Sequence, residues 1–223
     1  MDAFKVLEIK KNVYDGNDRR AESLRGSLRR DGVFMLNLMS SPGSGKTTTV
    51  MRTIEALRGE LRLGVLEADI DSDVDARTVA GSGTRVIQLH SGGMCHLTAD
   101  MARQGLDGLG TDGLDLVILE NIGNLICTAE VDVGASRSAM ILSVPEGDDK
   151  PLKYPMMFER VDALLINKID ALSLFDFDIE AVKERVTAMN PKARIFPISA
   201  KTGEGVAEWA DWLRSAVRDW KRA

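Results

Sequence analysis

Short apolar runs alternate with amphipathic segments along most of this chain, and this alternation restricts its fold more than any other feature. Each run has the length and composition of a buried parallel strand. The seven runs lie at 33–39, 63–68, 84–89, 114–119, 139–144, 163–166 and 194–198. Helical patterns separate most of them, at 48–58, 95–108, 176–189 and 204–219. This order predicts an α/β fold built from βαβ units, with a mostly parallel sheet and helices on both of its faces.

The composition fits one globular domain and argues against several classes of protein. The chain has 223 residues, of which 44% are hydrophobic and 28% are charged, and its formal net charge is -5. It has no sustained basic block, so nucleic-acid binding is not expected. No apolar run is long enough to cross a bilayer, and the charged amino-terminal stretch is unlike a secretory signal. We expect a cytoplasmic protein without membrane insertion, whose two cysteines stay reduced and available to metals.

The loop after the first strand is the first candidate site, because ligands of parallel sheets bind beyond the carboxyl ends of the strands. Its sequence, SSPGSGKT at 40–47, matches the phosphate-loop pattern except that Ser40 replaces the first glycine. The glycines let backbone N–H groups point at phosphates, Lys46 can reach the β- and γ-phosphates, and Thr47 can bind Mg²⁺. The residues expected to contact nucleotide here are Gly43, Ser44, Gly45, Lys46, Thr47 and Thr48.

The phosphate loop also sets the expected domain organisation. Residues 32–223 are predicted to form a single P-loop nucleotide-binding domain. Residues 1–31 precede it as an amphipathic helical extension, in which Gly16 marks a point where the helix is expected to break.

Two polar turns at later strand ends indicate which nucleotide is bound. The turn NKID at 167–170 carries Asp170, whose carboxylate can accept both N1–H and N2–H₂ of guanine, a donor pair that adenine lacks. In the turn SAK at 199–201, a backbone N–H can meet guanine O6. Each turn alone is weak evidence, but both together after a phosphate loop predict GTP. The residues expected around the base are Asn167, Lys168, Asp170, Ser199, Ala200 and Lys201.

The sequence ENIG at 120–123 follows another strand and resembles the D-x-x-G element of GTPases, with glutamate in place of aspartate. Glu120 can hold Mg²⁺ directly or through water, and the N–H of Gly123 can sense the γ-phosphate. Asp115 is the second candidate for Mg²⁺, but it lies at the start of the strand, at the wrong end of the sheet. The next residue is Asn124, so the glutamine that usually orients the attacking water is missing and slow hydrolysis is expected.

An acidic loop, EADIDSDVDAR at 67–77, follows the second strand and offers further ligands. Asp69 is closest to the strand end and can reach Mg²⁺ or the attacking water, and Asp75 can join when the loop closes. Arg77 can pair with a carboxylate or a phosphate, whereas Asp71 and Asp73 fit a solvated surface. The residues expected to support hydrolysis are Lys46, Asp69, Glu120 and Gly123. The residues expected around Mg²⁺ are Thr47, Asp69, Asp75 and Glu120.

Both cysteines and one histidine form a candidate for a second metal site. Cys95 and His96 follow the third strand at the start of a predicted helix, and Cys127 follows ENIG. All three lie beyond strand ends, so they can meet. Two thiolates and an imidazole suit Ni²⁺, Zn²⁺ or Cu⁺ but are too few for a closed site of four ligands, and a two-fold axis would double the set. A second interpretation stays open, because free cysteines are also common in cores.

Taken together, these motifs resemble the HypB family, the hydrogenase maturation GTPases that deliver nickel. The resemblance covers nearly the whole chain after the amino-terminal helix and rests on SSPGSGKT, the acidic loop, Cys95–His96, ENIGNLIC and NKID. It implies that Cys95, His96 and Cys127 bind Ni²⁺ or Zn²⁺ and that the protein is a homodimer when GTP is bound. It also implies delivery of nickel to the precursor of the [NiFe]-hydrogenase large subunit, together with a zinc-binding hydrogenase accessory protein.

The chain departs from some relatives, because it has no histidine-rich tract and no amino-terminal Cys-x-x-Cys motif. Nickel storage and a high-affinity amino-terminal nickel site are therefore not expected. The amino-terminal helix is then either structural or the docking surface for the partner protein, and the sequence leaves both open.

Three other functions compete with this one. The urease-type nickel chaperone GTPases share the fold, but they have a proline between the cysteine and the histidine, whereas Cys95 and His96 are adjacent. A P-loop small-molecule kinase is disfavoured by the guanine-type turns and by the lack of an obvious lid segment. A nucleotide-gated module without a metal role would keep both cysteines in its core, and Cys127→Ser would then leave metal binding unchanged.

Overall fold

The predicted strands form one sheet in the computed structural model, which describes residues 3–70 and 72–222. All paired neighbours run parallel, in the order β3-β2-β4-β1-β5-β6-β7. The strands are β1 (Phe34–Ser40), β2 (Leu63–Asp69), β3 (Arg85–His90), β4 (Leu116–Glu120), β5 (Arg137–Ser143), β6 (Ala163–Asn167) and β7 (Arg194–Pro197). The sequence placed each of them within two residues at either end.

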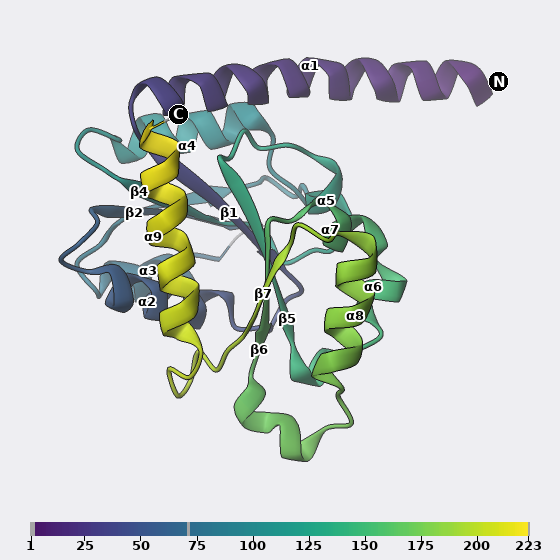
Figure 1. Cartoon of the computed structure of the whole chain (residues 1–223). Coiled ribbons are helices and arrows are strands. Elements are labelled where there is room, and N and C mark those ends of the chain that lie inside the picture. Colours follow the sequence, from purple (N-terminus) through teal and green to yellow (C-terminus); the bar gives the residue numbers. More distant parts are fainter. Residues whose placement is uncertain (1–2, 71, 223) are drawn as a thin grey trace.

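Helices cover both faces of this sheet, as right-handed crossovers require. The longer helices are α1 (Ala3–Arg30), α2 (Lys46–Leu57), α3 (Val74–Ala80), α4 (Ala99–Leu109), α7 (Pro155–Arg160), α8 (Ile179–Met189) and α9 (Val206–Arg222). The short ones are α5 (Cys127–Glu130), η1 (Val144–Glu146), α6 (Lys150–Lys153) and η2 (Ile169–Leu174). Figure 1 shows α9 and α8 on opposite sides of the sheet; α2 packs with α9 and α3, and α7 packs with α8 and α5.

The apolar runs are continuous because the central strands are buried on both faces. All seven residues of β1 are buried. Leu36 belongs to the larger core cluster, together with Val50 of α2 and Trp209 of α9. Met39 belongs to the second cluster, together with Phe158 of α7. The polar loops after the strands are therefore collected at one edge of a rigid sheet.

The amino-terminal helix α1 is continuous from Ala3 to Arg30, so the break expected near Gly16 is wrong. A glycine inside a helix costs only about 1 kcal/mol, and packing of the following turns offsets this cost. Leu24 and Leu28 are buried in the larger core cluster, and Arg25 pairs with Asp132 at 2.6 Å.

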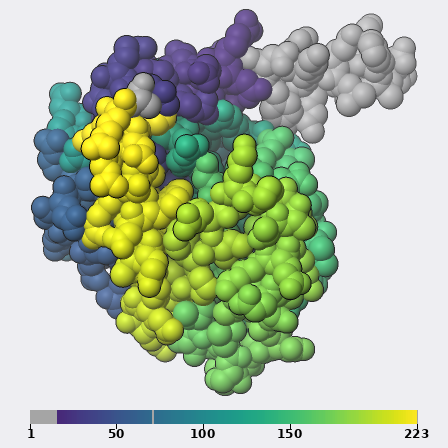
Figure 2. Space-filling model, in the orientation of Figure 1, coloured from purple at the N-terminus to yellow at the C-terminus, as the bar shows by residue number. Residues whose placement is uncertain are grey.

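The described part of α1 packs next to the carboxyl-terminal helix α9. Figure 2 shows it (purple) lying against the body beside α9 (yellow), where Arg29 stacks 4.3 Å from the ring centre of Trp220. The division of the chain at residues 31 and 32 and a docking role for α1 stay predictions.

Asp115 lies just before β4, at the amino end of the sheet, as the sequence indicated. Its carboxylate accepts from Arg62 Nε at 3.0 Å and from Lys221 Nζ. The bonds from Arg62 are the main reason that the pKa of Asp115 lies well below its usual range. Asp115 therefore anchors the end of α9 and is far from the loops at the carboxyl edge. Among the described residues, no helix combines the length and apolar character needed to cross a membrane.

Candidate nucleotide and metal site

The loop between β1 and α2 has the shape of a phosphate-binding loop. Gly43 and Gly45 have φ angles of 74° and 97°, a left-handed conformation that glycine adopts without strain. Ser44 Oγ donates to Ser40 Oγ at 2.6 Å, and Lys46 Nζ donates to the same oxygen at 3.2 Å. Ser40 is fully buried. The serine that replaces the expected glycine thus closes the base of the loop through its hydroxyl.

Asn167 joins the phosphate loop to the second guanine turn. Its Nδ2 donates to the carbonyl oxygen of Ser44 at 2.9 Å, and its Oδ1 accepts from the backbone N of Ala200 at 3.0 Å. A Cβ at Gly45 would lie 2.6 Å from Asn167 Nδ2, so this close approach requires glycine. The phosphate loop and both base-binding turns therefore form one connected unit.

The carboxylate of Asp170, predicted to select the base, is held by the neighbouring turn. Ser199 Oγ donates to Asp170 Oδ1 at 2.6 Å. Lys168 has a φ of 65°, and its Nζ donates to the carbonyl oxygen of Gly43 at 2.7 Å, so its side chain extends from the guanine turn to the phosphate loop. The sequence-predicted residues of both turns are thus brought together.

Arg52 of α2 supports the second turn, a role that the sequence analysis missed. Its Nε donates to the carbonyl oxygen of Ala200 at 2.9 Å and its Nη2 to that of Lys201 at 3.0 Å. Its Nη1 pairs with Glu55 at 2.8 Å. An arginine on a helix surface is too common to stand out in a sequence, and only the fold shows which turn it reaches.

Three carboxylates meet beside Thr47 and form a candidate Mg²⁺ site. Thr47 Oγ1 donates to Glu120 Oε1 at 2.9 Å. One carboxylate oxygen from each of Glu67, Asp75 and Glu120 lies within 4.8 Å of the others. We call these three residues the carboxylate cluster. Asp75 and Glu120 were expected here from the sequence, whereas Glu67 was not.

Glu67 and Glu120 have the properties of cation ligands. They are 2% and 1% exposed, and the Oε2 atom of each has no hydrogen-bond partner within the described chain. Burial is the main cause that raises the pKa of both carboxyls, and the charge of Glu120 raises that of Glu67 further. A divalent cation would satisfy both oxygens, and Mg²⁺ prefers oxygen ligands of this kind. The residues present therefore fit Mg²⁺.

Asp69 and Asp73, at the end of β2 and in the loop after it, do not belong to the carboxylate cluster. Asp69 ends β2, and its Oδ1 accepts from the backbone N of Ser72 at 2.8 Å. Arg77 pairs with Asp73 at 2.7 Å. Asp71 lies outside the described residues. The structure does not group Asp69 with the cluster, and its part in hydrolysis stays a prediction.

Cys95, His96 and Cys127 come together at the same edge of the sheet. Their ligand atoms lie within 4.8 Å of one another, and Cys95 Sγ is 3.7 Å from His96 Nδ1. Hydrogen bonding between the two thiols is the main cause that raises the pKa of the Cys127 thiol. The raised pKa favours the protonated thiol, whereas a bound metal cation would favour the thiolate. The three side chains are only partly buried, which favours a ligand set over core cysteines.

The helix that follows Cys95 and His96 begins later than the sequence predicted. Residues 95 and 96 lie in a loop, and α4 starts at Ala99. Thr98 caps it, since its Oγ1 accepts from the backbone N of Met101 at 3.4 Å. The expectation of a helix from residue 95 is therefore wrong, and the cysteine and histidine are held by a loop.

A parallel sheet that carries a phosphate loop, two guanine-type turns and buried carboxylates at one edge defines a P-loop nucleotide-binding protein. Comparisons with known proteins agree with this class. The family model for the CobW/HypB/UreG nucleotide-binding domain matches residues 34–197.

Individual relatives identify the branch of this class. The hydrogenase maturation factor HypB of Azotobacter chroococcum mcd 1 is 42% identical over 211 residues, which cover 94% of this chain and 68% of the relative. HypB of Escherichia coli strain K12 is 39% identical over 215 residues, which cover 96% and 74%. The crystal structure of Helicobacter pylori HypB in complex with nickel has a TM-score of 0.86 and 36% identity, covering 92% of this chain and 96% of that one. The chain belongs to the HypB family of hydrogenase maturation factors.

Proposed function

We propose that this protein is a cytoplasmic GTP-hydrolysing nickel chaperone that helps to insert nickel into [NiFe]-hydrogenase. The observation that carries the proposal is the segment from Glu120 to Cys127. Its first residue belongs to the carboxylate cluster beside the phosphate loop, and its last belongs to the cysteine–histidine triad. One short segment thus joins a nucleotide site to a metal site.

The nucleotide site supports GTP and its hydrolysis. Lys46 and the backbone of the phosphate loop bind the phosphates, and Asp170 selects guanine. Thr47, Glu67 and Glu120 would hold Mg²⁺, which supplies charge neutralisation at the phosphates when bound. Asp75, whose carboxylate already lies within 4.8 Å of both glutamates, would complete this set.

Nickel is the cargo, and the triad is an incomplete site for it. Two thiolates and an imidazole leave room for further ligands, which a second copy of the chain can supply across a two-fold axis. Two exposed apolar residues, Met94 and Ile126, adjoin the ligands Cys95 and Cys127. Apolar surface beside an incomplete site supports face-to-face dimerisation in the GTP state. The hydrogenase large-subunit precursor would then be the acceptor of the nickel, and a zinc-binding accessory protein would work together with this chain in the delivery.

The test is nickel bound per chain by equilibrium dialysis, with GDP and with a non-hydrolysable GTP analogue, together with the molar mass in solution. The proposal expects nickel binding to depend on the nucleotide and to follow the dimer. Cys127→Ser should abolish it, whereas Thr187→Ala, on the exposed surface of α8, should not. Analogue binding without nickel uptake in either state would leave a GTPase with core cysteines. The urease-type alternative predicts the same dialysis result. The two functions are distinguished by testing whether the chain activates hydrogenase or urease.

A further inference from the structure

The segment between the two sites contains a side chain whose role the function above does not explain. Asn124 occupies the position where many GTPases carry a water-orienting glutamine. Its side chain faces the metal ligand: Oδ1 accepts from the backbone N of Ile126 at 2.7 Å and from that of Cys127 at 2.9 Å. The carboxamide oxygen is thus committed to the turn that carries the thiol.

The residue before Asn124 lies against the phosphate loop. A Cβ at Gly123 would lie 3.0 Å from the backbone N of Pro42 and 3.0 Å from its Cγ. Position 123 therefore has no room for a side chain, and the backbone of Gly123 packs against Pro42 of the phosphate loop. A shift of Pro42 toward Gly123 would therefore have to displace Gly123 and, with it, the adjacent Asn124.

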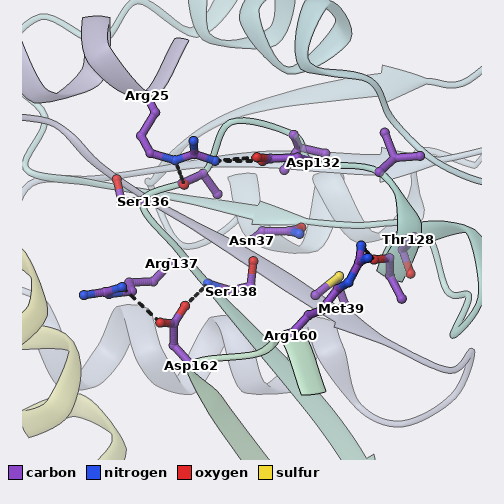
Figure 3. Close-up of a pocket in the computed structure, with 14 residues that line it drawn as sticks. Arg25, Asn37, Met39, Thr128, Asp132, Ser136, Arg137, Ser138, Arg160 and Asp162 are labelled. Atoms are coloured by element: carbon purple, nitrogen blue, oxygen red, sulfur yellow. Dashed lines mark hydrogen bonds and ion pairs between the residues drawn. The ribbon is translucent and has the colours of Figure 1, made fainter. Parts of the chain in front are cut away.

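Further contacts make the turn with Cys127 a compact unit. Thr128 is buried, and its Oγ1 donates to the carbonyl oxygen of Asn124. At the far end of α5, Arg160 Nη1 donates to the carbonyl oxygen of Ala129 at 2.8 Å. Figure 3 shows Arg160 beside Thr128, on one side of a cavity of about 360 Å³ behind α5. The turn is held at its rear by α7 and at its front by Asn124.

We propose that Asn124 is a positioning residue that couples the nucleotide-sensing loop to the nickel site by fixing the turn that presents Cys127. A shift at Gly123 then displaces the sulfur, because the turn follows the carboxamide while Arg160 holds its other end. The inference rests on the proposed function, since it needs a metal affinity that depends on the nucleotide. It names the residue through which that dependence passes.

The experiment measures Ni²⁺ affinity from the thiolate-to-nickel absorption band, with GDP and with a non-hydrolysable GTP analogue. The readout is the ratio of the two affinities, which a merely structural role would leave unchanged. For the wild type, coupling between sites typically gives a ratio of about fivefold or more. Asn124→Ala should bring this ratio close to one while the affinity for the analogue stays within about twofold of the wild type. Asn124→Asp keeps the acceptor oxygen and should retain the ratio.

Two controls separate the possible failures. Asn190→Ala removes another carboxamide that is hydrogen-bonded to the backbone. Asn190 Nδ2 donates to the carbonyl oxygens of Phe158 and Val161 at the opposite end of the sheet, and its loss should leave the ratio unchanged. A wild-type ratio of one would refute nucleotide control of the metal, and with it the proposed function. A wild-type ratio that survives in Asn124→Ala, or an equal loss of Ni²⁺ affinity in both nucleotide states, would overturn the role of Asn124 alone.

Discussion

Glu67 and Glu120 are direct register partners on the neighbouring strands β2 and β4, and both are almost completely buried. Two carboxyls that face each other away from water are costly, and their raised pKa values express this cost. The sheet therefore carries a local destabilisation next to the phosphate loop, which a bound cation would relieve. We therefore expect nucleotide binding at this site to depend on a divalent ion.

Glu67→Gln should weaken nucleotide binding without lowering the stability of the fold. In metal-free protein the variant should have an unchanged or higher melting temperature, because it removes one of two opposed carboxyls. Affinity for GTP in the presence of Mg²⁺ should fall by about 10- to 100-fold, as for other changes around metal ligands. Calorimetric titration with and without Mg²⁺ measures this. Glu180→Gln, on the exposed surface of α8, is the matched control; unchanged Mg²⁺ dependence in Glu67→Gln would remove the residue from the site.

Asp170→Asn should change the choice of base. The carboxylate is expected to accept two donors from guanine. An amide would supply a donor in place of one acceptor, so GTP binding should weaken by about 2 kcal/mol or more. Xanthine carries an oxygen where guanine has its N2 amino group, so xanthosine triphosphate should gain affinity in the variant. Competition between the two nucleotides on a fluorescent analogue gives both values. Loss of affinity for both nucleotides would show instead that the Ser199 bond to Asp170 mainly holds the turn.

Asp69→Ala tests a residue that the structure leaves outside the carboxylate cluster. We expect lower GTP turnover with unchanged GDP affinity, since Asp69 ends β2 at the edge where the nucleotide binds. Single-turnover hydrolysis measures the chemical step without product release. Asp73→Ala, in the same loop and paired with Arg77, is the control and should turn over normally. If both variants hydrolyse GTP as fast as the wild type, Asp69 has no part in hydrolysis.

The elements of this fold could be predicted from sequence more completely than the site. The central apolar runs became strands because burial on both faces demands unbroken apolar residues. The phosphate loop, NKID and the cysteine–histidine triad were also evident, because each uses residue types that its chemistry requires. Glu67 was missed because it lies inside a strand, and its meaning appears only when β4 places Glu120 opposite it. The carboxylate within an apolar run was the available signal.

Two other errors have local causes. Gly16 was expected to interrupt α1, but the buried leucines of the following turns hold the helix together. Asn124 was considered only as a substitute for glutamine, because the sequence does not show that its side chain turns back to the backbone of Cys127. Both cases depend on packing or side-chain direction, which a single sequence does not encode in a readable pattern.

Asp115→Asn should destabilise the fold in a pH-dependent manner. Its folded-state pKa is depressed by Arg62 and Lys221, so the stabilisation is fully present above the unfolded pKa of about 3.9 and is lost as the pH falls through the folded-state pKa. At pH 7 the variant should lose about 1 to 2 kcal/mol of unfolding free energy, since the partners are partly exposed. The gap between wild type and variant should be constant above roughly pH 5 and narrow below roughly pH 4. Urea unfolding between pH 3 and 8 measures it, with the exposed Asp107→Asn as control. A gap that stays the same throughout would mean that packing of α9, rather than these ion pairs, accounts for the loss.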